Sequence, residues 1–320
     1  MDATRKTANS LADKAHPPAD TAYQAVLDLT QAAQSTSTRR SYALAVRHFE
    51  AHGGQIGGSA QQLAEYLAAF AGKLAVATLE HRLIAIHRAH VELGLPSPAQ
   101  DRLVRKTMQG IRRSAGRGQR QVRALVKDDL LELLVAVSRQ KSIKAARDKA
   151  LLLIGFAGAF RRSELVALDV ADMTAYPHGL ELLIRRSKTD QEGAGRTLFI
   201  PLGSSPDRCP VTALAHWREL AGIDHGALFR PVNRHDQVLS GRRLTAQSVA
   251  LVIKSAMRQA RGEDASRQVS GHSLRAGFVT EAATAGLRNS AIMGQTGHKS
   301  LEMVYRYIRP VHRRQLASLL

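Results

Sequence analysis

The sequence predicts a mainly α-helical protein of two domains with one small antiparallel β-sheet. Helix-start signals recur through the first hundred residues, and apolar residues at helical spacing continue through most of the rest. Only residues 179–190 and 195–201 have the composition of strands, with a polar, glycine-containing turn between them. A chain of 320 residues with 44% hydrophobic content can bury two cores.

The N-terminal part divides into a tail and a helical domain. Residues 1–20 are polar and end in a proline pair, which predicts a disordered tail. Residues 21–115 form the helical domain, with helices expected to start at Ser37, Ser59 and Thr78. Ser59 and Gln62 have the spacing of a capping box. Glycine pairs and a Pro-Ser-Pro sequence separate the helices.

Residues 102–127 contain nine Arg or Lys and no acidic residue. Such a run is often the solvated face of a helix, but this one falls between two domain-like regions. That position favours a basic segment that wraps around a duplex, with the linker itself at residues 116–123.

The second domain is expected over residues 124–320. Apolar periodicity and turn residues predict helices in the ranges listed next, together with a last helical region that contains Tyr305 and Tyr307. The ranges are 126–138, 144–160, 210–222, 244–261 and 271–286.

The charge balance predicts a polyanionic partner. Lys and Arg number 46 against 27 Asp and Glu, a formal net charge of +19. An excess of this size favours nucleic acid, because neutralised phosphates release counterions, although a merely basic protein is the alternative. The single cysteine, Cys209, excludes an internal disulfide and a multi-cysteine zinc site. Without an apolar run or a signal peptide, the chain is expected to be cytoplasmic and nucleoid-associated.

Several short motifs bear groups that could bind or cleave a phosphodiester. Arg161 and Glu164 interrupt an apolar segment where a helix ends, and they could equally form a structural ion pair. His272 and Arg275 lie three residues apart, within reach of one ligand on a helix. Lys188 stands at a hairpin, where a lysine is ordinarily solvated. A Gly-His pair at His298 precedes Tyr307 by nine residues. None of these motifs is decisive alone.

In this order, the motifs closely resemble those of the tyrosine recombinase (phage-type integrase) family over residues 21–320. The resemblance is to its simple two-domain type, represented by Cre and the Xer recombinases. It implies a helical, SAM-like core-binding domain at residues 21–115, a catalytic domain at 124–320, and no additional arm-binding domain. It also implies site-specific DNA recombination through a 3′-phosphotyrosine and a Holliday junction, in integration, excision or resolution.

The resemblance also assigns roles to individual residues, which physical chemistry supports. Two guanidiniums can clamp the phosphate oxygens, while an imidazole can activate a phenol and an ammonium can protonate the leaving 5′ oxygen. The family spacing selects Tyr307 as the nucleophile rather than Tyr305. Glu164 is expected to orient the residues that touch the phosphate. The catalytic set is Arg161, Lys188, His272, Arg275, His298 and Tyr307.

No cofactor or metal is expected, because the phosphotyrosine conserves the energy of the cleaved bond. The sequence has neither a phosphate-binding GxxxxGK[ST] loop nor an acidic cluster suited to two metals. His81, His87 and His90 fall on one predicted helix and could suggest a metal site. They have no carboxylate or cysteine in register, so surface or DNA-facing positions are expected for them.

The expected partner is double-stranded DNA with inverted-repeat sites, bound by a homotetramer, with accessory DNA-bending proteins as further candidates. The residues expected to contact DNA are Ser37, Arg39, Arg40, His81 and Gln247. Residues 311–320 suit a short amphipathic helix that docks on a neighbouring protomer. Two other functions remain open: a monomeric enzyme like a type IB topoisomerase, and a catalytically silent DNA-binding regulator.

Overall fold

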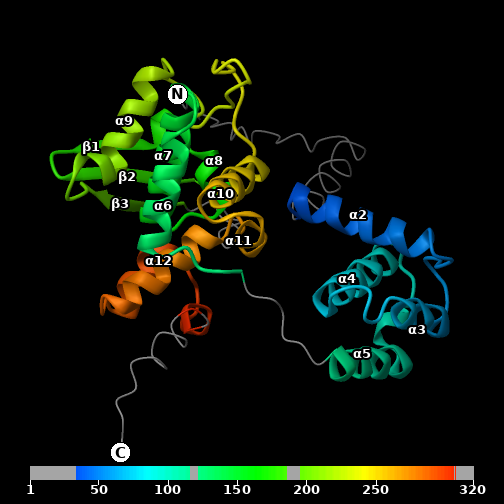
Figure 1. Ribbon diagram of the computed structural model, residues 1–320. Helices are drawn as coiled ribbons and strands as arrows, with labels where there is room; N and C mark the ends of the chain where they lie inside the picture. The colour runs from blue at the N-terminus through cyan, green and yellow to red at the C-terminus, as the bar shows by residue number, and fades with distance from the viewer. Residues whose placement is uncertain (1–33, 116–121, 186–194, 306, 308–320) are drawn as a thin grey trace, which may run out of the picture. The chain divides into compact units, whose positions relative to one another are not determined.

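The computed structural model describes residues 34–115, 122–185, 195–305 and 307 (Figure 1). The chain divides into two compact units, Met1–Arg120 and Gln121–Leu320. Both are built mainly from helices, and the second also contains a three-stranded antiparallel sheet. The fold class predicted from the sequence is therefore confirmed. No helix within the described ranges is long and apolar enough to cross a membrane.

Where it is described, the first unit contains four α-helices and a short 3-10 turn. They are α2 (Thr36–Glu50), α3 (Ala60–Ala69), α4 (Val76–Glu92), the turn η1 (Pro98–Gln100) and α5 (Arg102–Ala115). Apolar side chains from all four α-helices meet in one core, which includes Phe49, Leu63, Leu67, Leu79, Ile86 and Met108.

Three predicted helix starts in this unit can be compared with the structure. Ser35, not Ser37, caps α2, because its hydroxyl accepts the Thr38 N–H at 3.1 Å. Ser59 does cap α3, yet Gln62 contacts Gln55 N and Gly53 O instead of closing a capping box. The third helix, α4, begins at Val76, without a side-chain cap and two residues before the predicted Thr78.

The basic segment of residues 102–127 is divided between the two units. Its first part is α5, an amphipathic helix whose Val104, Met108 and Ile111 are buried at helical spacing while its basic side chains are exposed. Its last part belongs to the second unit, because Arg123 N–H donates to Gln268 O and the fully buried Leu125 donates to Ser273 O. Residues 116–121 lie outside the described residues.

Eight α-helices, followed by a helical segment at residues 301–305, form most of the second unit where it is described. Nine of the sixteen residues of α7 are buried, which places this helix at the centre of the core. The side chain of Trp217 is fully buried in the same core, and its Nε1–H donates to Leu228 O. The helices are α6 (Lys127–Ser138), α7 (Ser142–Ala157), α8 (Arg162–Ala167), α9 (Pro210–Leu220), α10 (Ala246–Arg261), α11 (Glu263–Gln268), α12 (Ser273–Thr284) and α13 (Asn289–Thr296).

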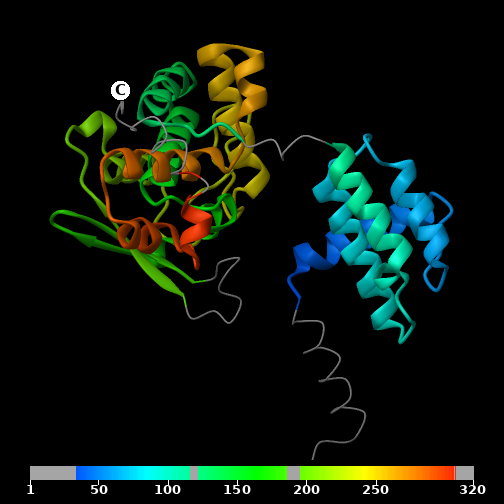
Figure 2. The ribbon, with the colours of Figure 1, turned by 90° about the horizontal axis from the view of Figure 1, so that it is seen from below.

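The sheet lies at one side of these helices (Figure 2). It consists of β1 (Met173–Tyr176), β2 (Gly179–Ile184) and β3 (Arg196–Pro201), in that order and antiparallel. β2 and β3 are the two strands expected from the sequence, and their register pairs Ile184 with Arg196. β1 was not predicted, since its four residues are mostly exposed and give no apolar alternation. The connection from β2 to β3, which includes Lys188, is outside the described residues.

Candidate active site

Arg161 and Glu164 are fixed by the turn between α7 and α8. Ala159 in this turn adopts a left-handed backbone with φ of 47°, and Arg161 stands at the N-cap of α8. The buried Glu164 carboxylate accepts two hydrogen bonds from Arg161, one from the backbone N–H at 3.0 Å and one from the side-chain Nη1 at 2.6 Å. The structural ion pair considered from the sequence therefore exists, and it holds the guanidinium of Arg161 in one orientation.

Arg275 is completely buried near the start of α12. Its Nη1 donates to the carbonyl oxygen of Ala159 at 2.8 Å, whereas Nε and Nη2 have no hydrogen-bond partner among the described residues. Burial, followed by the nearby charge of Arg161, lowers the pKa of Arg275 to about 10. Buried donors are nearly always paired in proteins, so this guanidinium has the features of an anion site without its anion.

The hydroxyl of Tyr307 lies beside an imidazole. Its Oη is 2.5 Å from Nε2 of His272, and the two ring centroids are 6.0 Å apart. Burial lowers the pKa of His272, and the charges of Arg275 and Arg161 lower it further. The ring is therefore neutral near pH 7, and Nε2 can accept the phenolic proton.

His298 completes the cluster on the other side of Tyr307. It is buried, and its ring stacks on that of Tyr307 with centroids 6.2 Å apart. Thr296 Oγ1 donates to Ile292 O at 2.7 Å, so it is positioned to accept from His298 Nδ1 at 2.9 Å. Burial, followed by Arg275 and Arg161, lowers the pKa of His298 to about 3. In the neutral ring with this tautomer, Nε2 can only accept; a phosphate would favour the protonated ring, in which both nitrogens donate.

Residues 123–314 match the model of the phage integrase family. The chain belongs to this family. An integrase/recombinase XerD homolog from Selenomonas ruminantium is 38% identical over 78% of this chain and 73% of its own length. The recombinase Cre of Escherichia phage P1 is 26% identical over 74% of this chain and 71% of its own. The family and the enzyme class inferred from the motifs are thereby confirmed.

Solved structures of the same family share the fold. XerH site-specific recombinase bound to palindromic difH substrate matches 96% of this chain and 90% of its own, with a TM-score of 0.59 at 19% identity. A lambda integrase dimer bound to a COC′ core site matches 94% of this chain and 78% of its own, with a TM-score of 0.61 at 14% identity.

Five of the six residues predicted for catalysis in this integrase-family chain are described, and all five meet at one place in the second unit. Tyr307 contacts His272 and His298 directly. Arg161 and Arg275 lie close enough for their charges to lower the pKa of His298, and Arg161 also lowers the pKa of Arg275. The sixth, Lys188, lies outside the described residues. Tyr305 packs instead against the apolar cluster of Val279, Ala282, Ala283, Ile292 and Val304, a cluster that Tyr307 also touches.

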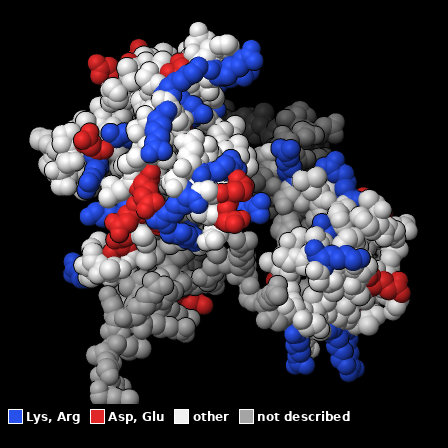
Figure 3. All heavy atoms as spheres, in the orientation of Figure 1, with Lys and Arg blue, Asp and Glu red and all other residues white. Residues whose placement is uncertain are grey.

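The predicted DNA-contacting residues fall in both units. Ser37, Arg39 and Arg40 are exposed in the first turns of α2, and Gln247 is exposed in the first turn of α10. His81 is half-buried on α4 and turns toward α2, with Nε2 3.1 Å from Ser41 Oγ. On the face seen in Figure 3, Lys and Arg are spread over both units, with more acidic side chains among them on the second.

The three histidines of α4 have separate environments. His90 is fully buried, so the surface position expected for it is wrong. Its Nδ1 donates to Ile86 O at 2.7 Å, while its Nε2 accepts the Gly57 N–H at 2.9 Å. Both ring nitrogens thus serve the fold. Within the described part of the chain, no three His, Cys, Asp or Glu side chains are grouped to hold a metal.

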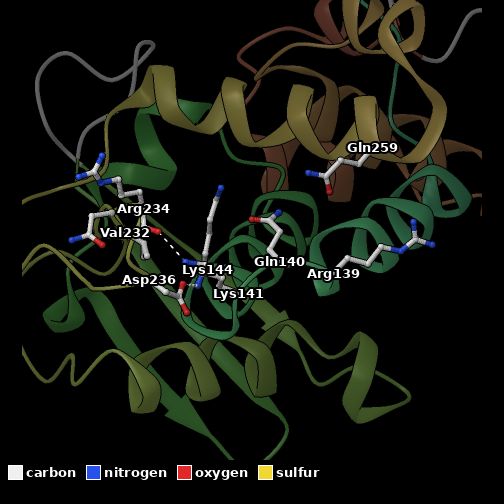
Figure 4. A pocket seen from close by; sticks show the side chains of 9 residues that line it. Arg139, Gln140, Lys141, Lys144, Val232, Arg234, Asp236 and Gln259 are labelled. Carbon is white, nitrogen blue, oxygen red and sulfur yellow. Dashed lines mark hydrogen bonds between the residues drawn. The ribbon is translucent and has the colours of Figure 1, made fainter.

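A cavity of about 700 Å³ lies away from the predicted catalytic residues, between the turn joining α6 to α7 and residues 232–236 (Figure 4). Its basic lining includes Arg139, Lys141 and Lys144. The Asp236 carboxylate accepts the N–H groups of Ile143 and Lys144, at 3.0 and 2.9 Å. The N-terminus of α7 is therefore already satisfied by a carboxylate, and none of the predicted catalytic residues lines this cavity.

Proposed function

We propose that this protein is a site-specific DNA recombinase that cleaves and rejoins strands through a covalent bond to Tyr307. The observation that carries the proposal is the 2.5 Å contact between Tyr307 Oη and His272 Nε2. It lies beside Arg275, which has two unpaired buried donors among the described residues. A nucleophile, a base and an incomplete anion site thus occur together.

In the proposed reaction, Tyr307 Oη attacks the scissile phosphorus while its proton passes to His272 Nε2. The bond from phosphorus to the 5′ oxygen breaks, and that oxygen takes a proton from Lys188. The product is a 3′-phosphotyrosine and a free 5′-hydroxyl. Attack by a 5′-hydroxyl from a second duplex reverses the step, and one such exchange of strands gives a Holliday junction.

Charge stabilisation is the main contribution of the surrounding residues. Arg161 and Arg275 bind the non-bridging oxygens, on which negative charge grows as Tyr307 attacks. Glu164 holds Arg161 in place through its two hydrogen bonds. His298 donates from Nε2 once the phosphate has raised its pKa, because an adjacent anion favours the protonated ring.

The DNA substrate is proposed to be a duplex with inverted-repeat sites. A net charge of +19 favours a phosphate backbone, and the XerH and lambda integrase structures named above contain DNA sites. Ser37, Arg39, Arg40 and His81 in the first unit and Gln247 in the second are proposed contacts. Association with the nucleoid follows from this substrate, and accessory DNA-bending proteins could help to align two sites.

Four protomers are proposed to hold two sites, with residues 311–320 of each docked on its neighbour. These residues lie outside the described part of the chain, so the proposal rests on their amphipathic sequence and the family resemblance. Deleting them should abolish the tetrameric complex and recombination while leaving half-site binding intact. Gel shifts on half-site and full-site DNA measure both. A truncated protein that recombines normally would contradict the tetramer contact.

The decisive experiment is a denaturing gel for covalent protein–DNA adducts with the parent, Tyr307→Phe and Tyr305→Phe proteins. We expect the adduct with the parent and with Tyr305→Phe, and none with Tyr307→Phe, which should still bind DNA because it lacks only the nucleophilic oxygen. A silent DNA-binding regulator would give no adduct even with the parent. An enzyme of the type IB topoisomerase kind would form the adduct but relax supercoils as a monomer.

A further inference from the structure

Arg196, the first residue of β3, presents donors that the predicted catalytic set does not include. Its Nη1 donates to the carbonyl oxygens of Gly294 and Gln295, at 3.2 and 3.1 Å, in the last turn of α13. Its Nε and Nη2 are buried and have no hydrogen-bond partner among the described residues. Nε and Nη2 form the side edge of a guanidinium, which offers two parallel donors to one anion.

Arg275 shows the same pattern. Its Nη1 also donates to a backbone carbonyl, and its Nε and Nη2 are also buried and unpaired among the described residues. Over the described ranges, Arg196 and Arg275 alone have unpaired buried guanidinium nitrogens. Buried Arg147 shows the usual arrangement, since Asp148 accepts from its Nε and Nη2 at 2.9 and 2.7 Å. The shared pattern of Arg196 and Arg275 therefore indicates a missing anion.

Arg196 also lies next to the catalytic cluster. Gly297 has a left-handed backbone with φ of 65°, and a Cβ placed on it would come within 2.8 Å of Arg196 Nε. The guanidinium thus packs against the residue that precedes His298. Its charge adds a small contribution, after burial and Arg161, to the lowered pKa of both His298 and Arg275. Burial lowers the pKa of Arg196 itself, which nearby Glu164 raises and Arg161 lowers.

The charges in this cluster favour a highly charged ligand. Arg161, Arg196 and Arg275 contribute three positive charges and Glu164 one negative charge, so these four residues alone have an excess of two positive charges. A phosphodiester has one negative charge, and attack by a phenolate brings a second to the same phosphorus. Each guanidinium that contacts the phosphate therefore stabilises the transition state, where this negative charge is larger, more than it stabilises the bound substrate.

We propose that Arg196 is a third guanidinium that contacts the scissile phosphate, through Nε and Nη2. The proposal rests on the recombinase function above and adds a residue to its phosphate site. It gives β3 a direct part in the reaction.

The test compares single-turnover cleavage of two substrates, one with the normal scissile phosphate and one with a neutral methylphosphonate at that position. Arg196→Ala should slow cleavage of the normal phosphate about a hundredfold, as loss of an oxyanion donor does. On the methylphosphonate, which lacks one charged oxygen, the loss should shrink to a few-fold. Arg275→Ala should show the same difference between the two substrates. Arg185→Ala, at the end of β2 with its guanidinium already paired to Asp169 and Asp172, should change neither rate much.

Two results would overturn the proposal. An equal loss on both substrates would mean that Arg196 acts only by supporting the turn after α13, and an unchanged rate would mean that it has no part in cleavage. Arg196→Lys retains the charge, and its half-site binding and Trp217 fluorescence check the fold. Its defect should show the same substrate dependence. If the parent formed no covalent adduct, the recombinase function itself would fail, which is a separate result.

Discussion

The two units of this protein differ in how they satisfy buried polar groups. In the described part of the first unit, the one buried side-chain atom without a partner is a ring nitrogen of His87, whereas His90 uses both of its ring nitrogens. In the second unit, Arg196 and Arg275 each leave two charged donors unpaired within the described residues. Apart from that nitrogen of His87, the buried side chains of the described first unit are paired without a ligand, and three of its proposed DNA contacts, Ser37, Arg39 and Arg40, are exposed. The second has buried donors that an anion could pair.

The same contrast exists between two arginines of the second unit. Arg147 and Arg275 are both buried, at 5% and 0% exposure. Asp148 neutralises Arg147 and accepts two of its donors, whereas a backbone carbonyl is the partner of Arg275. Burial raises the pKa of Asp148 despite Arg147, so even this pair bears a desolvation cost. We therefore expect Arg147 to matter more for folding and Arg275 to matter more for binding a phosphate.

The largest expected effect is on the free energy of unfolding, which should differ between variants of these two arginines. Arg147→Leu should lower the free energy of unfolding by about 3–5 kcal/mol, because it leaves the Asp148 carboxylate buried and unpaired. Arg275→Leu should change it by less than about 1 kcal/mol, since an apolar side chain replaces a poorly compensated charge. Urea unfolding followed by the fluorescence of Trp217, the single tryptophan of the chain, reports on this unit. Equal losses for the two variants would remove the distinction.

The rate of cleavage, in contrast to stability, should depend strongly on Arg275. Arg275→Lys and Arg161→Lys should each slow single-turnover cleavage by about 10²–10³-fold, because an ammonium cannot offer the planar pair of donors that a guanidinium presents. Arg162→Lys is the matched control, since Arg162 follows Arg161 directly and is exposed. Its rate should stay within a few-fold of the parent. Rates near the parent for Arg275→Lys would contradict the phosphate clamp.

The sequence predicted the residues of the site better than their surroundings. Ordered spacing was enough to select Arg161, His272, Arg275 and Tyr307, because each stands at a fixed distance from a recognisable neighbour in the chain. Arg196 has no such neighbour. Its position depends on Gly294 and Gln295, almost one hundred residues later in the chain, so it emerges only from the tertiary structure.

The fold shows the same division between local and tertiary information. Helices with regular apolar spacing were predicted, because the signal lies within each helix. The basic composition of α5 concealed its apolar stripe of Val104, Met108 and Ile111, so no individual helix was predicted there. β1 was missed because its pairing with β2, rather than its own composition, makes it a strand.

A moderate effect is expected from the pH dependence of stability. The pKa of His298 is lowered to about 3 in the folded protein, so below its unfolded value of 6.5 the unfolded chain binds the proton more tightly. Stability is therefore lost as pH falls. Between pH 7 and pH 5 this one group should account for about 2 kcal/mol. His298→Gln should lose that much less over the same interval, as followed by Trp217 fluorescence. An unchanged pH dependence in this variant would show that His298 is not held neutral by burial.

The smallest effect is expected in the first unit, where function depends on exposed charge. Arg40 is exposed near the start of α2, and its proposed DNA contact adds one neutralised phosphate. Arg40→Ala should leave folding unchanged and reduce the slope of log affinity against log salt by about 0.9. Arg112→Ala in the same unit is the matched control, because its guanidinium already pairs with Glu80 at 2.7 Å. Half-site binding between low and moderate salt measures both. If the two variants gave the same slope as the parent, Arg40 would have no place in the DNA contact, and α2 would serve the first unit only as part of its fold.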